Sequence, residues 1–204
     1  MTKVNVTRIT PEAQRIGTFA TCVVMRGAPG CGKSTKAKEM KEELESAGLR
    51  VGIFSTDSIF MNAKGEYEFV PFAIGAAHAF EAHELLLSMR MREYDVYILD
   101  NTNLQKWEYL WLLREAMYEH MSVFVWDLRK GPNYGNIHGV PESKVKMMLE
   151  TSDKPYPIHI EKFYAKNQQF YDWITHTYDH TAGGHIGLYA AIRYDRGIPH
   201  EATG

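Results

Sequence analysis

The stretch that decides the fold is CVVMRGAPGCGKST, residues 22–35. Its second half, Gly27–Ser34, fits the pattern G-x-x-x-x-G-K-[ST] of a phosphate-binding loop. The apolar, β-forming residues before the loop predict a buried strand at about 20–26, and residues 35–47 space their apolar side chains along one face of a helix. The sequence therefore predicts a strand, a loop and a helix in the order that phosphate binding requires.

Each residue type in this loop has a physical reason to be there. The glycines at 27, 30 and 32 allow positive φ angles and a close approach of the backbone, so that successive N–H groups can face phosphate oxygens. Lys33 can reach the β- and γ-phosphates, and the Ser34 hydroxyl can bind Mg²⁺. We therefore expect ATP and Mg²⁺ as cofactors, with a nucleotide site made of Gly27, Ala28, Pro29, Gly30, Cys31, Gly32, Lys33, Ser34 and Thr35.

The rest of the chain alternates between strand-like and helix-like segments. This alternation predicts an α/β fold, a parallel sheet with helices on both faces, and the loop indicates a P-loop NTPase fold. We expect one domain over residues 1–204, with a C-terminal extension at about 153–204. The expected strands are 49–55, 94–99, 122–128 and an edge strand at 186–194; the expected helices are 71–93, 105–120, 141–151 and 158–174.

Composition narrows the class of protein. The chain has 204 residues, 45% of them hydrophobic and 24% charged, which is typical of a globular protein with a real core. A net charge of −2 argues against a large basic surface that binds along nucleic acid. A local basic patch could still bind the end of a nucleic-acid strand. No apolar run approaches the length of a membrane span, and two cysteines make no disulfide framework, so we expect a cytoplasmic protein without a membrane partner.

Two acidic residues follow predicted strands. Asp100 closes the apolar run 96–99, which is the Walker B arrangement in which a carboxylate orients Mg²⁺ or its water shell. Asp57 follows the second predicted strand and should face the phosphates from the acceptor side, where a general base is needed. In parallel sheets ligands bind at the carboxyl ends of the strands, so both acids should meet the phosphate loop there.

Four segments in this order resemble the phage-type polynucleotide kinases, P-loop kinases related to the AAA and zeta-toxin proteins. The resemblance covers about residues 20–150 and implies that Asp57 is the general base, that Lys33 and Ser34 are the lysine and serine of the loop, and that Asp100–Asn103 is a structural and substrate-side loop. The segments are GAPGCGKST at 27–35, STD at 55–57, LDNTNL at 99–104 and HGVP at 138–141.

The sequence departs from that family at two positions. The resemblance implies a P-loop NTPase kinase fold with a lid loop, here at about 129–140. The family's lid supplies an arginine to the transferring phosphoryl group, but the corresponding residue here is Gly135. Arg129 and Lys130 are the nearest cations, and we assign the role to Arg129. Phe60 stands where such kinases can carry a basic residue that holds the acceptor's phosphate.

These observations predict a kinase that transfers the γ-phosphoryl group of ATP to a hydroxyl, with the 5′-hydroxyl of a polynucleotide as the first choice. The catalytic residues are Asp57, Lys33 and Arg129, and the metal residues are Ser34 and Asp100. The expected partners are a nucleoside triphosphate and a nucleic-acid end or nucleotide-like acceptor. Two alternatives remain open: a kinase of another hydroxyl, such as a hydroxymethylated base in DNA, a nucleoside or a small metabolite, and a nucleotide-gated binding module with slow ATPase activity.

Overall fold

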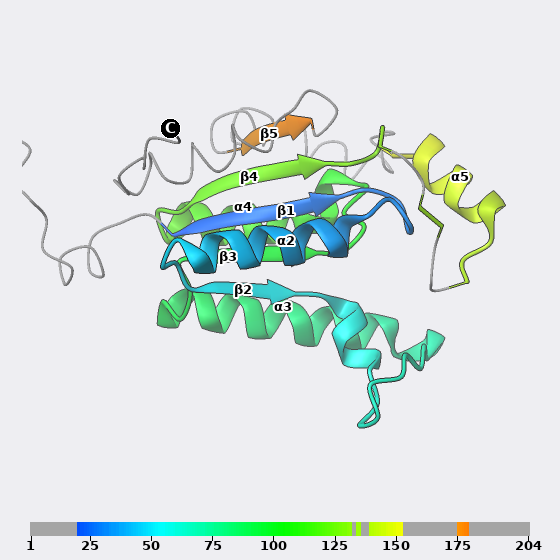
Figure 1. The fold of residues 1–204 in the computed structure, drawn as a ribbon, viewed down its shortest axis with the longest axis horizontal. Helices are drawn as coiled ribbons and strands as arrows, with labels where there is room; N and C mark the ends of the chain where they lie inside the picture. The colour runs from blue at the N-terminus through cyan, green and yellow to red at the C-terminus, as the bar shows by residue number, and fades with distance from the viewer. Residues whose placement is uncertain (1–19, 132–133, 136–138, 153–174, 180–204) are drawn as a thin grey trace, which may run out of the picture.

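A five-stranded parallel sheet organises the protein (Figure 1). The computed structural model describes residues 20–131, 134–135, 139–152 and 175–179. The strands are β1 (Thr21–Arg26), β2 (Val51–Phe54), β3 (Val96–Asp100), β4 (Ser122–Asp127) and β5 (Thr175–Asp179), in the spatial order β2-β3-β1-β4-β5.

The strand that carries the phosphate loop lies at the centre of the sheet. All six residues of β1 are buried, and β1 pairs in parallel with β3 on one side and β4 on the other. Its apolar, β-branched sequence suits this position, because a central strand of a parallel sheet is covered on both faces. The loop that follows β1 therefore starts from the most constrained part of the fold.

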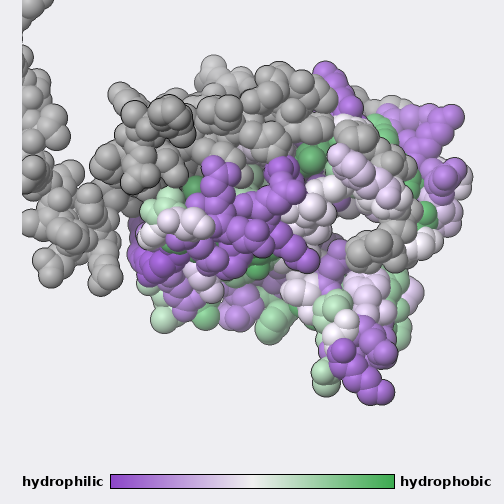
Figure 2. Space-filling view, in the orientation of Figure 1, coloured by the Kyte–Doolittle hydropathy of each residue, from purple (hydrophilic) through white to green (hydrophobic). Residues whose placement is uncertain are grey.

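Helices cover both faces of the sheet, as the sequence predicts (Figure 1). Successive β1 residues point to opposite faces: Val23 and Met25 belong to the core that contains Met40 of the first described helix, while Cys22 and Val24 belong to the opposite core. Figure 2 shows hydrophilic side chains on the outer face of that first helix. The helices are α2 (Lys33–Ser46) on one face, α3 (Ile74–Met91) and α4 (Leu110–Tyr118) on the other, and α5 (Glu142–Glu150) beyond the end of β4.

The expected element boundaries shift by a few residues in several places. Pro71 opens a short 3₁₀ turn, Pro71–Ala73, and α3 begins only after it. Likewise the helix expected from residue 105 starts as a 3₁₀ turn, Lys106–Tyr109, before α4. Single 3₁₀ turns are common at helix N-termini, where the first N–H groups have no intrahelical partner.

Little of the C-terminal part belongs to the described residues. The edge strand expected at 186–194 and the helix expected at 158–174 lie outside the described residues. One strand that was not predicted from the sequence, β5 (Thr175–Asp179), extends the sheet by pairing in parallel with β4. In the ranges that the structure covers, no helix is long and apolar enough to cross a membrane.

Candidate active site

The phosphate loop lies between the end of β1 and the start of α2. Gly30 and Gly32 have φ angles of +84° and +86°, which side chains with a Cβ rarely adopt. A Cβ on Gly27 would collide with the sulfur of Cys31, so no larger residue fits at this position without a shift of Cys31. The Gly27 N–H donates to the Thr102 carbonyl at 2.9 Å, which ties the loop to the segment after β3.

Lys33 lies along this loop with little of its side chain exposed. Only 9% of the residue is accessible, and Nζ donates to the Ala28 carbonyl oxygen at 3.0 Å. The Cys31 sulfur lies 3.9 Å from the same nitrogen. The ammonium therefore lies against the loop itself, on neutral partners that an anionic phosphate would replace.

Asp100 ends β3 and is buried beside the start of α2. Burial raises the pKa of its carboxyl above the ordinary value, although a hydrogen bond from Ser34 and the charge of Lys33 lower it. Its Oδ1 atom has no hydrogen-bond partner among the described residues. A buried carboxylate oxygen without a donor, next to a hydroxyl, is a donor set that fits Mg²⁺ or its coordinated water.

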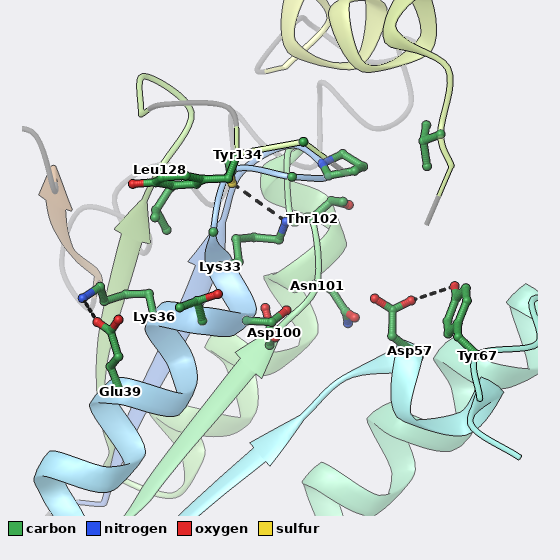
Figure 3. A pocket seen from close by; sticks show the side chains of 18 residues that line it. Lys33, Lys36, Glu39, Asp57, Tyr67, Asp100, Asn101, Thr102, Leu128 and Tyr134 are labelled. Carbon is green, nitrogen blue, oxygen red and sulfur yellow. Dashed lines mark hydrogen bonds and ion pairs between the residues drawn. The ribbon is translucent and has the colours of Figure 1, made fainter. Parts of the chain in front are cut away.

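Asp57 lies on the other side of the site, in the 3₁₀ turn Thr56–Phe60 that follows β2. Its Oδ1 accepts a hydrogen bond of 3.1 Å from the Tyr67 hydroxyl (Figure 3). Burial, followed by the charge and hydrogen bond of Asp57, raises the pKa of Tyr67 to about 12, so the phenol stays protonated and keeps donating. The negative charge of Asp57 also helps to raise the pKa of Asp100, as expected for two carboxylates that share a site.

A cavity of about 680 Å³ brings these groups together. Its volume is within the usual range for small-molecule sites. Gly27 and Ala28 contribute to the loop without lining the cavity. The predicted residues that line it are Pro29, Gly30, Cys31, Gly32, Lys33, Ser34, Thr35, Asp57 and Asp100.

Arg129 does not line this cavity. Its Nε lies 2.9 Å from both carboxylate oxygens of Asp127, and Nη1 donates to the Ser152 hydroxyl at 3.2 Å. Lys130 is likewise not a lining residue. Phe60, the position without a basic side chain, is buried and packs edge-on against the rings of Tyr67 and Phe69.

Other lining residues were not named individually as site residues from the sequence, although several lie in segments that were expected near the site. Tyr134 is the most prominent: its N–H donates to the Gly30 carbonyl at 2.9 Å, and its ring lies where a Cβ on Gly32 would be in tight contact, at 3.1 Å. Tyr134 lies in the segment 129–140, which was expected to be a lid, but no local pattern marks this residue itself. Asn101 and Thr102 belong to the segment Asp100–Asn103, which was expected to be near the site. The additional lining residues are Lys36, Glu39, Tyr67, Asn101, Thr102, Leu128, Tyr134, Gly135 and Val140.

Known proteins support the same fold. The family model AAA_33, described as an AAA domain, matches residues 22–126, just over half of the 204-residue chain. No curated protein matches the chain. Together with the parallel sheet and loop, the family match confirms the predicted α/β, P-loop kinase-like fold.

Several solved structures are similar at low sequence identity. Kti12 from Chaetomium thermophilum, in complex with ADP-AlF3, is 18% identical over 67% of this chain and 82% of its own, with a TM-score of 0.46. A gluconokinase from Sinorhizobium meliloti 1021 is 14% identical over 89% of this chain and 92% of its own, with a TM-score of 0.45. A chain of the Pnkp1/Rnl/Hen1 complex is 17% identical over 69% of this chain and 43% of its own, with a TM-score of 0.42.

Proposed function

Because this chain belongs to the AAA_33 family of AAA domains, we propose that it is a phosphotransferase that moves the γ-phosphoryl group of ATP to a hydroxyl group. One observation carries the proposal: the phosphate loop and two carboxylates in different environments line the same cavity. Asp100 is buried against Ser34 and Lys33, whereas Asp57 comes from a separate segment after β2. A nucleotide-gated module would need the first carboxylate but has no use for a second one on the acceptor side.

The phosphate side of the site binds and neutralises charge. The loop amides and Lys33 hold the phosphates of ATP, and Ser34 and Asp100 hold Mg²⁺. When bound, the ion neutralises negative charge on the phosphate oxygens. The start of α2 at Lys33 adds the positive end of a helix dipole to the same place.

The acceptor side activates the nucleophile. The acceptor oxygen forms a bond to the γ-phosphorus as the bond to the β,γ-bridging oxygen breaks, and Asp57 takes the proton of the hydroxyl. The Tyr67 hydroxyl donates to Oδ1 of Asp57 and so orients the carboxylate that receives this proton.

Arg129 remains our proposed source of positive charge for the transferred group. It is held by Asp127 and Ser152, so it can act only if residues at the base of the proposed lid, 129–140, rearrange. Lys36, which lines the cavity and pairs with Glu39, is the alternative cation.

For the acceptor, we propose the 5′-hydroxyl of a polynucleotide, on the strength of the four motifs at 27–35, 55–57, 99–104 and 138–141. A second candidate, a hydroxyl on a small or neutral molecule, is favoured by the apolar Phe60 and by the exposed acids Glu66 and Glu68 on the neighbouring turn. Carboxylates near the acceptor would repel a phosphate backbone.

One transfer assay separates these possibilities. The protein is incubated with γ-labelled ATP, Mg²⁺ and, in parallel, 5′-hydroxyl DNA, 5′-hydroxyl RNA, hydroxymethyluracil DNA and a panel of nucleosides. Label on either 5′-hydroxyl polymer supports the first candidate, and label only on the modified base or a nucleoside supports the second. ATP hydrolysis without any labelled acceptor would contradict the kinase proposal for these acceptor classes and favour the nucleotide-gated module.

A further inference from the structure

A buried carboxylate lies on α3, outside the phosphate loop and the two acids already described. Glu81 is only 5% exposed, and its side chain accepts hydrogen bonds from residues of two other segments. Asn101 Nδ2 lies 2.8 Å from both Glu81 oxygens, and the Thr56 hydroxyl donates to Oε2 at 3.1 Å. A buried charge is costly unless it is satisfied in this way, so the arrangement is specific to these partners.

Both partners of Glu81 are chain neighbours of the proposed active-site acids. Thr56 precedes Asp57, and Asn101 follows Asp100. The two segments are also joined directly, because the Thr56 N–H donates to Asn101 Oδ1 at 3.0 Å. The hydrogen bonds form a closed ring of Glu81, Asn101 and Thr56, which we call the Glu81 clamp.

His78 borders this clamp from one turn earlier on α3. Its Nδ1 lies 2.9 Å from the Thr56 hydroxyl and 3.8 Å from Glu81 Oε2. The nearby Glu81 carboxylate raises the pKa of His78, burial lowers it, and the charges of Glu108 and Asp57 add to the rise. With Nδ1 protonated, the Thr56 hydroxyl accepts from His78 and donates to Glu81, so every group in the cluster is satisfied.

We propose that Glu81 is a positioning residue that fixes the acceptor-side acid relative to the metal-side acid. The clamp joins α3, the turn after β2 and the end of β3, and without it only one hydrogen bond in this cluster, from Thr56 to Asn101, connects the last two segments. The inference deepens the proposed function and rests on it, because the spacing matters only if the two carboxylates act in one transfer. Misplacing a reacting group by about 1 Å can cost about 100-fold in rate.

The first test replaces the charge with a matched amide. In Glu81→Gln, the side chain keeps its size but one acceptor oxygen becomes a donor, which faces a donor of Asn101. We expect kcat for transfer to the best acceptor of the panel to fall about 10- to 100-fold, with KM for ATP changed less than about 3-fold. Glu84→Gln, on an exposed acid of the same helix, is the matched control and should leave both constants unchanged.

The second test reverses the polarity of the same hydrogen bond. Combining Glu81→Gln with Asn101→Asp lets the new amide donate to the new carboxylate, while the amide oxygen still accepts from Thr56 and the other carboxylate oxygen still accepts from the Thr56 N–H. Asn101→Asp alone opposes two carboxylates and should be the worst variant. The double variant should recover more than about 3-fold of the kcat lost in Glu81→Gln.

A third readout needs no acceptor. Hydrogen–deuterium exchange at the Thr56 amide reports the link to Asn101 directly, and we expect it to speed up at least 5-fold in Glu81→Gln and to slow again in the double variant. Unchanged exchange, or a kcat equal to that of Glu84→Gln, would overturn the clamp. If the wild-type protein labels no acceptor, the proposed function fails, while the exchange experiment still decides whether Glu81 holds the two segments.

Discussion

At the scale of single residues, the proposed site depends on two carboxylates that differ in burial and in hydrogen-bond partners. Asp100 is 6% exposed with one oxygen that lacks a donor among the described residues, and Asp57 keeps a hydrogen bond from Tyr67. The first environment suits a cation, and the second suits a base that must stay accessible to a substrate. Substitutions at these two positions should therefore have different effects.

Asp57→Asn should abolish phosphoryl transfer while leaving the affinity for ATP within a few-fold of the wild-type value. An amide cannot take the proton of the acceptor hydroxyl. ATP affinity should be kept because the loop amides and Lys33, not residue 57, hold the phosphates. The measurement is the transfer assay with the best acceptor, together with calorimetric titration of ATP. Transfer at the wild-type rate would remove Asp57 from its proposed role.

Asp100→Asn should stabilise the protein without nucleotide by roughly 1 kcal/mol near neutral pH and should abolish the effect of Mg²⁺ on nucleotide affinity. Burial raises the pKa of Asp100, so the folded protein binds this proton more tightly than the unfolded chain does. The protonated Asp100 carboxyl therefore contributes to the free energy of unfolding at low pH. That contribution is lost as pH rises from the ordinary carboxyl pKa through the raised one.

Urea denaturation of the wild-type protein and the Asp100→Asn variant between pH 4 and pH 8 measures this difference. The stability advantage of the variant should grow with pH across that window. An advantage that stays constant with pH, or that grows as pH falls, would contradict a buried charge at Asp100.

At the scale of elements, helix α2 joins the core to the site. Met40 and Leu44 bury its inner face against the sheet, and its N-terminus forms the end of the phosphate loop. A left-handed glycine lies at each end of this helix: Gly32 at φ +86° and Gly48 at φ +84°. The two glycines have the same backbone requirement but different surroundings.

Gly48→Ala should lower the free energy of unfolding by about 1 kcal/mol and leave nucleotide binding intact, because an added Cβ there meets nothing within 4 Å. Gly32→Ala carries the same backbone cost and also crowds the Tyr134 ring at 3.1 Å, so it should weaken ATP binding at least 10-fold as well. Thermal denaturation and ATP titration of both variants test the pair. Equal ATP affinity in the Gly32→Ala and Gly48→Ala variants would contradict the expected effect of a side chain at position 32 on the loop.

At the scale of the whole molecule, the parallel sheet brings separate segments to one edge. The loops after β1, β2 and β3 all contribute lining residues to the cavity, and Leu128 follows β4. Ligand binding at that edge should therefore stabilise the fold as a unit.

Saturating ATP and Mg²⁺, at about 100 times the dissociation constant, should raise stability by about 2.7 kcal/mol, or roughly 5–11 °C in Tm for a chain of this size. Lys33→Met should remove most of this shift, since the ammonium lies against the phosphate loop. Differential scanning fluorimetry with and without ligand measures it. A full shift in the Lys33→Met variant would place the nucleotide elsewhere.

Much of this molecule could be predicted from local sequence patterns. The strands β1 to β4, the loop and the helices α2 to α5 were expected within a few residues, because apolar runs, spacing and glycine positions are properties of short segments. β5 was missed, since THTYD at 175–179 carries little apolar signal and becomes a strand by pairing with β4. Arg129 could be named as a cation, but its pairing with Asp127 could not be inferred.

By itself, then, the sequence determined the phosphate loop, the alternation of strands and helices, and the positions of two acids at or just after the ends of strands. Those features depend on backbone freedom and on side chains within a few residues of one another. Only the tertiary structure decided that Tyr134 packs on the loop, that Tyr67 holds Asp57, and that Glu81 links Thr56 to Asn101. These contacts join residues that are 10 to 102 positions apart, and such pairs acquire a defined distance only when the sheet fixes the segments that carry them.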